Sequence, residues 1–553
     1  MLLKTGVRHI LLIVPPNITF EAFARPSPNV RRIRKKTGDY GSLTTDMPLG
    51  LLCLSAYLKK SLPVKVSLVD CNVELNRSDA FQFESFKDYF LQALSRSDLK
   101  DDPPDLIGIS ALFTSTFRNL IDLGECGRTA YPSAFIVAGG AVPTNMYREI
   151  YSESSCFDAL CFGEGEKPLL GLLRAPDKKM FCEDDPSWIT PGKLRRRIMP
   201  SHAFVEDLDE IPFCDYALCA TQDYSRNPAI TAYPGEKNKT DVFYTMTSRG
   251  CPHQCSFCSS HTVHGRRMRY YSVARVAQDL GRLHNDFGAK VLVFQDDHFL
   301  SNRDRAIKII KIIKEAGITA VFANGLALYA LDKELLGLLK SAGVSQLNLP
   351  IESGSERVLR EIIHKPLSLP KISWVLDECR RLGIYTTVNA IIGFPGETKQ
   401  DIAQTRAFLK TLPANWFTVF CANPLVGSEL CDICKKDGKI KLKKTGSDYK
   451  TAIIETDEFS AEYIQEIEYL SNLELNFVHN NDMRLGEYES ALKGLETAIR
   501  SRSDHVFAYH YAAQCYEKLG SAEKSKRYSA HANQLLQQSV FWRKYADMFK
   551  IAL

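Results

Sequence analysis

The chain has 553 residues, too many for one hydrophobic core, so its length predicts two to four domains. Its 70 basic and 65 acidic residues nearly balance, which gives no reason to expect a nucleic-acid partner. No apolar segment reaches the ~18 residues of a membrane-spanning helix, and the run at residues 10–14 is too short for a signal peptide. We therefore expect a cytoplasmic protein whose 16 cysteines are mostly free thiols, metal ligands or catalytic groups.

Residues 1–175 alternate apolar runs with helical patterns. Five runs predict buried parallel strands: HILLIVPP, VKVSLVDCN, PDLIGISAL, SAFIVAGGAVP and FDALCFGEGE. The alternation predicts a doubly wound, Rossmann-like α/β domain, which would bind a ligand at the carboxyl ends of its strands. No G-x-G-x-x-G sequence follows the first strand, so a nicotinamide site is poorly supported.

Residues 176–240 are rich in proline and charge and predict an irregular linker. A second alternation fills residues 241–450. Its six apolar runs, from DVFYTMTS to WFTVFCANP, are mostly separated by helical segments of ten or more residues. Six β/α units predict a partial (β/α)6 barrel of the TIM type, with its active site at the carboxyl ends of the strands.

Residues 451–553 are predicted to be helical. The segments LGEYESA and LGSAEKS contain Gly486 and Gly520, which are 34 residues apart, the period of tetratricopeptide (TPR) repeats. At most about two repeats fit, fewer than the ~3 usual for an independent array. We therefore expect this TPR-like tail to dock on the barrel, with Phe507, Tyr511 and Cys515 forming one buried stripe. The alternative is an exposed aromatic surface that binds a protein partner.

Three cysteines lie together just after the first predicted barrel strand. Cys251, Cys255 and Cys258 have the spacing C-x3-C-x2-C, and no fourth cysteine follows on the same loop. Three thiolates can hold a [4Fe–4S] cluster by three of its irons and leave the fourth open to another ligand. A zinc site completed by His253 or His261 is the less favoured alternative, because structural zinc takes four ligands.

The motif C-x3-C-x-aromatic-C at this place in a β/α barrel resembles the radical S-adenosylmethionine (SAM) superfamily, with Phe257 in the aromatic position. The resemblance implies that SAM binds the open iron and that one electron cleaves it to a 5′-deoxyadenosyl radical. Flavodoxin or ferredoxin would then be the electron donor. Besides Phe257, the positions that the resemblance implies for SAM binding are Gln295, Asp296, Asp297, Glu352, Gly393 and Phe394.

Most of these positions could instead have a purely structural role. Asp296 and Asp297 could cap the next helix, Glu352 could pair with an arginine, and residues 393–396 could be only a turn. Gln295-Asp296-Asp297 also departs from the glycine- and glutamate-containing motif that the superfamily usually has there.

A doubly wound domain ahead of such a barrel resembles the cobalamin-binding branch of the superfamily. The resemblance rests on PLGLLCLSAYL, VDCN, IGIS, VAGGAVPT and GEGE, between residues 48 and 166. The D-x-H-x-x-G motif, which supplies a histidine below the cobalt in some relatives, is absent. The alternative is a domain that has lost cobalamin and acts as a lid. The positions implied for cobalamin binding are Pro48, Gly50, Leu51, Ser110, Gly139, Gly140, Gly163 and Glu164.

Together these resemblances imply a cobalamin-dependent radical SAM methyltransferase that methylates an unactivated carbon of a small-molecule, lipid or peptide substrate. We expect no catalytic residues beyond the cofactor ligands, because the cofactors carry the difficult steps. The rival functions are an oxidative cyclase with the same cofactors, and a scaffold that senses redox state or cobalamin.

Overall fold

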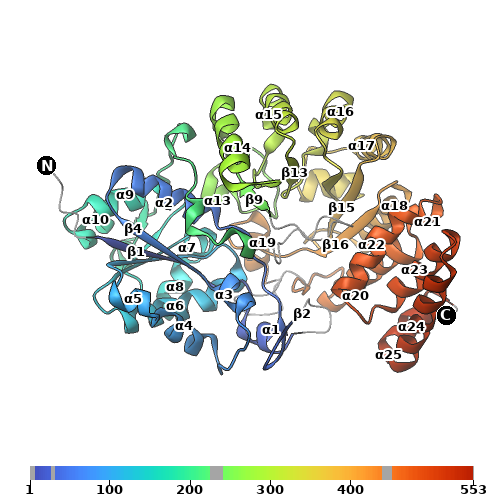
Figure 1. The fold of residues 1–553 in the computed structure, drawn as a ribbon, viewed down its shortest axis with the longest axis horizontal. Coiled ribbons are helices and arrows are strands. Elements are labelled where there is room, and N and C mark those ends of the chain that lie inside the picture. The colour runs from blue at the N-terminus through green and yellow to red at the C-terminus, as the bar shows by residue number, and fades with distance from the viewer. Residues whose placement is uncertain (1–6, 27–31, 225–240, 439–450, 552–553) are drawn as a thin grey trace.

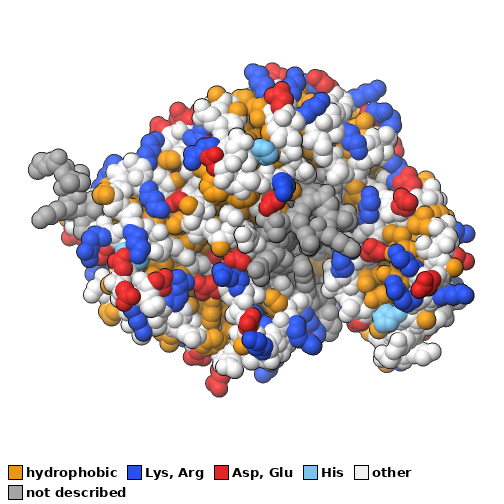
Figure 2. Space-filling view, in the orientation of Figure 1, with side chains coloured by type: hydrophobic (Ala, Val, Ile, Leu, Met, Phe, Trp, Pro, Cys, Tyr) orange, Lys and Arg blue, Asp and Glu red, His pale blue; other side chains and the backbone are white. Residues whose placement is uncertain are grey.

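The computed structural model describes residues 7–26, 32–224, 241–438 and 451–551. Figure 1 shows the amino-terminal unit at the left, the barrel strands and their helices at the upper centre and right, and the carboxyl-terminal helices at the lower right. Figure 2 shows basic and acidic side chains intermixed over this face, as expected for a nearly balanced charge. No helix in the described part of the chain is long and apolar enough to cross a membrane.

The amino-terminal unit is built on one six-stranded sheet. Neighbouring strands are parallel except at the last pair, where β8 runs antiparallel to β7. All five predicted strands are present, and the first strand lies between the second and third, as in a flavodoxin-like doubly wound sheet. In sheet order the strands are β4 (Lys65–Asp70), β1 (His9–Val14), β5 (Leu106–Ser110), β6 (Phe135–Gly139), β7 (Ala159–Cys161) and β8 (Trp188–Ile189).

Helices cover both faces of this sheet, as alternate side chains of β1 show. Ile10 and Leu12 belong to a core shared with α2, α9 and the barrel, whereas Leu11 and Ile13 pack with α4 and α6. The two faces are therefore apolar, which explains why the strands read as continuous apolar runs. The helices are α1 (Phe20–Ala24), α2 (Leu49–Ser61), α3 (Cys71–Arg77), α4 (Phe86–Leu94), α5 (Ser97–Asp101), α6 (Phe117–Ala130), α7 (Ala141–Asn145), α8 (Tyr147–Glu153) and α9 (Glu166–Arg174).

Two features of this half differ from the sequence prediction. A hairpin of β2 (Arg32–Lys35) and β3 (Gly38–Gly41) lies between α1 and α2. The start of the predicted linker instead folds as α10 (Lys178–Asp184), β8 and α11 (Pro191–Arg195), and so extends the amino-terminal unit. A two-residue strand is too short to give a periodic signal, so only its pairing with β7 reveals it. Helix α12 (Thr221–Tyr224) follows.

The barrel contains the six predicted strands as two parallel three-stranded sheets. Their orders are β13-β12-β9 and β14-β15-β16, and the described strands β13 and β14 are not joined by a hydrogen-bonded ladder. A short antiparallel pair, β10 (Ser248–Arg249) and β11 (Arg269–Tyr270), flanks the cysteine loop. The strands are β9 (Val242–Thr245), β12 (Val291–Phe294), β13 (Thr319–Phe322), β14 (Gln346–Glu352), β15 (Tyr385–Ile392) and β16 (Trp416–Cys421).

Amphipathic helices follow the barrel strands and bury one apolar stripe each, as Val276, Leu280 and Leu283 do in α14. A π-helical turn at Val358–Ile362 follows β14. The helices are α13 (His261–His264), α14 (Val273–Phe287), α15 (Arg303–Glu315), α16 (Lys333–Ser341), α17 (Leu369–Arg381), α18 (Lys399–Thr411) and α19 (Glu429–Lys436).

The helical tail docks on the barrel, as predicted. In the predicted stripe, Phe507 and Cys515 are buried and Tyr511 is partly buried, in a cluster that also contacts Trp416 of β16. A π-helical turn at Glu474–Val478 follows the first tail helix. The tail helices are α20 (Ala461–Leu473), α21 (Asn481–Arg484), α22 (Tyr488–Ser501), α23 (Val506–Lys518), α24 (Ala522–Gln538) and α25 (Val540–Met548).

Asparagines of the tail cover the outer edge of β16. Asn476 accepts a hydrogen bond from Phe417 N and donates one to Phe417 O, both at 2.8 Å. Asn472 makes the same pair of bonds with Val419, at 2.9 Å each. The side chains thus replace a neighbouring strand and satisfy backbone groups that an open edge would leave unpaired.

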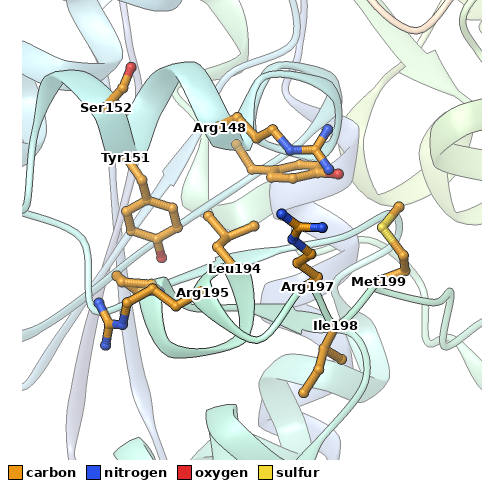
Figure 3. A pocket seen from close by; sticks show the side chains of 10 residues that line it. Arg148, Tyr151, Ser152, Leu194, Arg195, Arg197, Ile198 and Met199 are labelled. Carbon is orange, nitrogen blue, oxygen red and sulfur yellow. The ribbon is translucent and has the colours of Figure 1, made fainter.

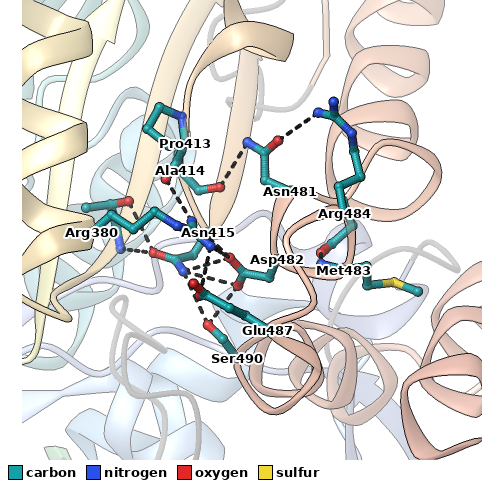
Figure 4. A network of polar contacts seen from close by, with 12 residues as sticks. Arg380, Pro413, Ala414, Asn415, Asn481, Asp482, Met483, Arg484, Glu487 and Ser490 are labelled. Atoms are coloured by element: carbon teal, nitrogen blue, oxygen red, sulfur yellow. Dashed lines mark hydrogen bonds and ion pairs between the residues drawn. The ribbon is translucent and has the colours of Figure 1, made fainter. Parts of the chain in front are cut away.

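A second contact between tail and barrel centres on the fully buried carboxylate of Asp482 (Figure 4). It accepts hydrogen bonds from Asn415 Nδ2 at 3.0 and 3.1 Å and from Ser490 Oγ at 2.7 Å, and pairs with Arg380 at 3.4 Å. These partners come from α17, from the residue before β16 and from α22, so one carboxylate joins three segments.

Candidate functional site

The three-cysteine loop lies between β10 and α13, and its backbone is fixed at several points. Gly250 has φ +92°, and a Cβ there would lie 2.4 Å from Arg267 O, so glycine is required. Ser256 N donates to Ile363 O at 3.1 Å, and Leu430 N donates to Ser256 O at 2.8 Å. The loop is therefore anchored between the end of the π-helical turn and the start of α19.

The three thiols of this loop differ from most cysteines of the chain. Eleven of the 16 cysteines are buried, whereas Cys251, Cys255 and Cys258 are partly exposed. Burial raises the pKa of Cys255 to about 11, and the two neighbouring thiols add to the shift. These soft donors on one anchored loop fit a [4Fe–4S] cluster, which takes one thiolate on each of three irons.

The described residues contain no group of three His, Cys, Asp or Glu side chains that could hold a single metal ion. The ligands of a cluster need not converge on one point, because each binds a different iron. Of the two histidines in the zinc alternative, His253 is engaged by Tyr329 Oη, at 2.8 Å from Nε2. Nothing in the described part of the chain supports a zinc site.

The two aspartates after β12 have different surroundings. Asp296 is buried and accepts hydrogen bonds from Thr247 N, Thr247 Oγ1 and Ser248 Oγ, at 3.0, 2.7 and 2.6 Å. It therefore joins β12 to the β9–β10 segment. Asp297 is partly buried, and burial raises the pKa of its carboxyl. Neither aspartate caps α15, whose N-cap is Asn302.

Gln295 and Glu352 lie at strand ends of the barrel. The Gln295 carbonyl accepts a hydrogen bond from Asn324 Nδ2 at 3.1 Å, which ties the end of β12 to the end of β13. Glu352 has φ +68° at an irregularity of β14, an unfavourable conformation for a residue with a side chain. Its Oε1 accepts a bond from Lys365 Nζ at 2.7 Å, so its partner is a lysine and not an arginine.

The loop after β15 packs against the tail. Gly393 has φ +93°, and a Cβ there would lie 2.9 Å from Ile464 Cγ2 of α20. Phe394 is buried, and its ring lies 6.3 Å from that of Phe257 in the cysteine loop. Glu397 Oε2 accepts hydrogen bonds from Gly393 N and Phe394 N, at 2.6 and 3.0 Å. The Glu397 carboxyl group, which sequence reasoning missed, therefore shapes this loop.

Glu397 leads to a prediction on pH dependence. Its side chain is fully buried, and burial raises the pKa to about 8. Folding therefore takes up a proton between about pH 4.5 and pH 8, and the free energy of unfolding falls as pH rises through this window. Glu397→Gln stays neutral and should remove that fall, which we expect to be of order 1–4 kcal/mol.

The measurement is urea unfolding of both proteins across the window. Glu361→Gln, at an exposed position on the neighbouring π-helical turn, should keep the wild-type pH profile. Parallel pH profiles for Glu397→Gln and wild type would show that Glu397 does not titrate there.

The predicted cobalamin-binding positions are at or near the carboxyl edge of the amino-terminal sheet. Ser110 and Gly139 end β5 and β6, and Pro48 precedes α2. Gly140 has φ +99°, and a Cβ there would lie 2.7 Å from Ala111 O. Gly163 has φ +78°, and a Cβ there would lie 2.5 Å from the His202 ring. Both glycines are therefore required by packing within the protein, and the predicted positions Ser110, Gly139 and Pro48 lie at the edge where a doubly wound sheet binds its ligand.

At two other predicted positions, Leu51 and Glu164, the side chain is already engaged in contacts within the protein. Leu51 is buried in the core, away from solvent. Glu164 accepts hydrogen bonds from Arg269 at 2.6 and 2.9 Å and from His264 at 2.8 Å, and it pairs with Arg249 at 3.2 Å. Burial alone would raise the pKa of Glu164, but these three partners hold it well below its usual range. Both oxygens of Glu164 therefore join the amino-terminal unit to the barrel in this structure.

A second prediction compares the effect on stability of replacing Gly140 and Gly50 by alanine. Gly140→Ala places a methyl group against the Ala111 carbonyl at positive φ, and we expect a loss of about 2–4 kcal/mol in the free energy of unfolding. Gly50 is exposed in α2 with open space around its Cα, so Gly50→Ala should be neutral or stabilise by up to about 1 kcal/mol.

Urea unfolding of the two alanine variants measures this difference. Cobalamin affinity is measured separately and tests the role of Gly50. If cobalamin lies against Gly50, the added methyl group should weaken cobalamin binding without affecting folding. Equal stability of the two variants would contradict the packing argument.

A cavity of about 430 Å³ separates the carboxyl edge of the amino-terminal sheet from the cysteine loop. Leu112 and Phe113, which follow β5, are 55% and 46% exposed, unusual for large apolar side chains that line a cavity. Sequence reasoning missed both, because nothing distinguishes them from core residues until the barrel is placed opposite. The lining consists of residues 112–114, 141–142, 146, 257–260, 324 and 425–426.

A second cavity, of about 710 Å³, lies on the amino-terminal unit between α8 and α11 and includes no residue of the cysteine loop (Figure 3). Arg148, Arg195 and Arg197 line it, together with Tyr147 and Tyr151. It is therefore separate from the site described above.

Two family models match the two units. The B12 binding domain matches residues 43–173, and the radical SAM superfamily matches residues 245–409. Among curated proteins, an uncharacterized methyltransferase of Pyrococcus horikoshii is 29% identical over 430 residues, 77% of this chain and 82% of that protein. The cytidylyl-2-hydroxyethylphosphonate methyltransferase of Streptomyces wedmorensis is 28% identical over 422 residues, 71% of this chain and 78% of that protein.

The whole fold is similar to that of a solved protein. OxsB, a cobalamin-dependent S-adenosylmethionine radical enzyme with aqua-cobalamin and SAM bound, aligns with a TM-score of 0.60 at 14% identity. The alignment covers 99% of this chain and 81% of OxsB. The likeness extends over both units and the tail, so the arrangement of domains, and not only each domain, is shared.

Proposed function

We propose that this chain, a radical SAM enzyme with an amino-terminal B12-binding domain, is a methyltransferase that adds a methyl group to an unactivated carbon. The observation that carries the proposal is the cavity of about 430 Å³, which is lined by the cysteine loop and by the segments that follow β5 and β6. A substrate there would touch both cofactors. The names of the two relatives, both methyltransferases, favour methyl transfer over other uses of the same cofactors.

The chemistry divides between the cofactors and the chain. When bound, the cluster with SAM supplies radical hydrogen abstraction and the cobalamin supplies the methyl group. Cys251, Cys255 and Cys258 would hold the cluster by three of its irons and leave the fourth for SAM. Leu112 and Phe113 line the cavity together with residues of the cysteine loop and give it an apolar wall.

For SAM, we propose contacts from the ends of three barrel strands. Asp297 and Gln295 follow β12, Glu352 ends β14, and the Gly393-Phe394 backbone follows β15. Asp297 is favoured over Asp296, whose oxygens are already engaged by Thr247 and Ser248. Phe257 and Phe394 would together support one side of the ligand.

For cobalamin, we propose contacts from Pro48, Gly50, Ser110, Gly139 and Gly140. The apolar residues of the shared cavity favour a small-molecule substrate with an uncharged region near the reacting carbon. A flavodoxin or ferredoxin would supply electrons.

A test that needs no substrate is available. Protein reconstituted without oxygen, then reduced with SAM and hydroxocobalamin, should release 5′-deoxyadenosine and S-adenosylhomocysteine and should yield methylated cobalamin. These products report SAM cleavage and methyl loading separately. SAM cleavage without methyl loading would favour the oxidative cyclase, for which a product screen should find no added carbon. Absence of both would favour the sensing scaffold.

A further inference from the structure

A pair of thiols lies outside the site, where the two halves of the molecule meet. Cys53 is on α2 of the amino-terminal unit, and Cys214 is on the segment that leads towards the barrel, 161 residues later. Their Sγ atoms are 2.7 Å apart, closer than the ~3.5–4.0 Å at which nonbonded carbon atoms pack. The separation approaches the ~2.05 Å of a disulfide bond.

The backbone on both sides of the pair is held in place. Asp215 N donates to Leu52 O at 3.2 Å. The Asp215 carboxylate accepts hydrogen bonds from Ser55 Oγ at 2.7 Å and from Lys59 Nζ at 2.6 Å. Hydrogen bonds therefore hold the residues beside Cys53 and Cys214 together. A small movement of the two side chains would bring the sulfurs to the distance of a covalent bond.

The two thiols differ in protonation and access. The hydrogen bond from Cys214 lowers the pKa of Cys53 despite burial, and the nearby Arg249 guanidinium lowers it further. Cys214 has a raised pKa because it donates that hydrogen bond and is itself desolvated. Cys53 is buried, whereas Cys214 is partly exposed. Within the pair, the hydrogen bond therefore favours the ionised form of Cys53, and Cys214 is the more exposed of the two residues.

We propose that Cys53 and Cys214 are a redox modification site, at which glutathione disulfide oxidises the two thiols to a disulfide. Cys53 Sγ takes the proton of Cys214 along their hydrogen bond, so that Cys214 Sγ attacks a sulfur of glutathione disulfide as a thiolate, forms a mixed disulfide and releases one glutathione. Cys53 Sγ then attacks Cys214 Sγ, forms the intramolecular bond and releases the second glutathione. The two thiols lose two electrons and two protons, and both glutathione molecules leave as thiols.

The bond would tie α2 to the segment that precedes the barrel. Because α2 begins at the sheet edge proposed for cobalamin, the cross-link would restrain the amino-terminal unit against the barrel. A covalent link across 161 residues also reduces the freedom of the unfolded chain, so the melting temperature of the oxidised protein should rise by about 3 °C or more.

Peptide mapping tests the proposal on the full-length protein with its cluster bound. The protein is treated with glutathione disulfide without oxygen, quenched in acid, alkylated and digested with trypsin. We expect a cross-linked pair of peptides 37–59 and 198–226, lighter by two hydrogens than the sum of the free thiol peptides and separable by dithiothreitol.

Peptide 198–226 also contains Cys219, which provides the matched control. Cys219→Ser should keep the cross-link and Cys214→Ser should lose it. In wild-type protein, alkylation of Cys53 after treatment, or a stable glutathione adduct on Cys214 that Cys53 does not displace, would overturn the proposal even if a variant failed to fold.

Discussion

Replacement of Cys251, Cys255 or Cys258 by alanine is expected to abolish SAM cleavage. Each thiolate would hold a different iron, so each single change would leave two of the four irons without a protein ligand in place of one. Iron content should fall from about four per chain to less than about one. The readouts are iron and sulfide analysis after reconstitution without oxygen, and 5′-deoxyadenosine release after reduction.

Cys219→Ala is the matched control, because Cys219 is partly exposed like the three loop cysteines but lies in another segment. It should keep both the iron and the SAM cleavage of the wild-type protein. If a loop variant retained four irons and normal cleavage, the assignment of that cysteine as a ligand would be wrong.

Removal of residues 451–553 is expected to give insoluble protein. The deletion uncovers the outer edge of β16, whose backbone groups at Phe417 and Val419 bond to Asn476 and Asn472. It also exposes Trp416 and the apolar contacts of the tail. An open strand edge beside an apolar surface favours aggregation. Soluble expression and the melting temperature measure the effect.

A single substitution tests the same contact in an intact chain. Asn476→Ala leaves the N–H and C=O of Phe417 without partners in a buried place, which should cost about 2–5 kcal/mol in the free energy of unfolding. Gln537→Ala, at an exposed position of α24, should change it by less than about 0.5 kcal/mol. Urea unfolding of both variants gives the comparison.

The tail experiment also distinguishes its two interpretations. A truncated protein that stays soluble and cleaves SAM normally, but fails on its true substrate, would make the tail a binding surface for a partner. The contact of Ile464 with Gly393 instead joins the tail to the loop proposed for SAM. On that basis we expect truncation to impair SAM binding even in any soluble fraction.

The strands of both units and the cysteine loop could be predicted from the sequence. Short apolar runs such as HILLIVPP and SAFIVAGGAVP are enough to predict a buried parallel strand. The ligand spacing of Cys251, Cys255 and Cys258 is likewise local. Short pieces, such as β8 and the β2–β3 hairpin, were not predicted, because two to four residues show no period.

The sequence by itself determined the order of the domains and the spacing of the three cysteines proposed as cluster ligands, because each depends on residues that are neighbours in the chain. Only the tertiary structure decided that Glu164 joins the two units, that Leu112 and Phe113 face the cysteine loop, and that Asn476 completes β16. It also brought Cys53 to Cys214. These contacts join residues that are tens to hundreds of positions apart. Which residues meet depends on how the apolar faces of whole elements pack together, and no short stretch of sequence encodes that packing.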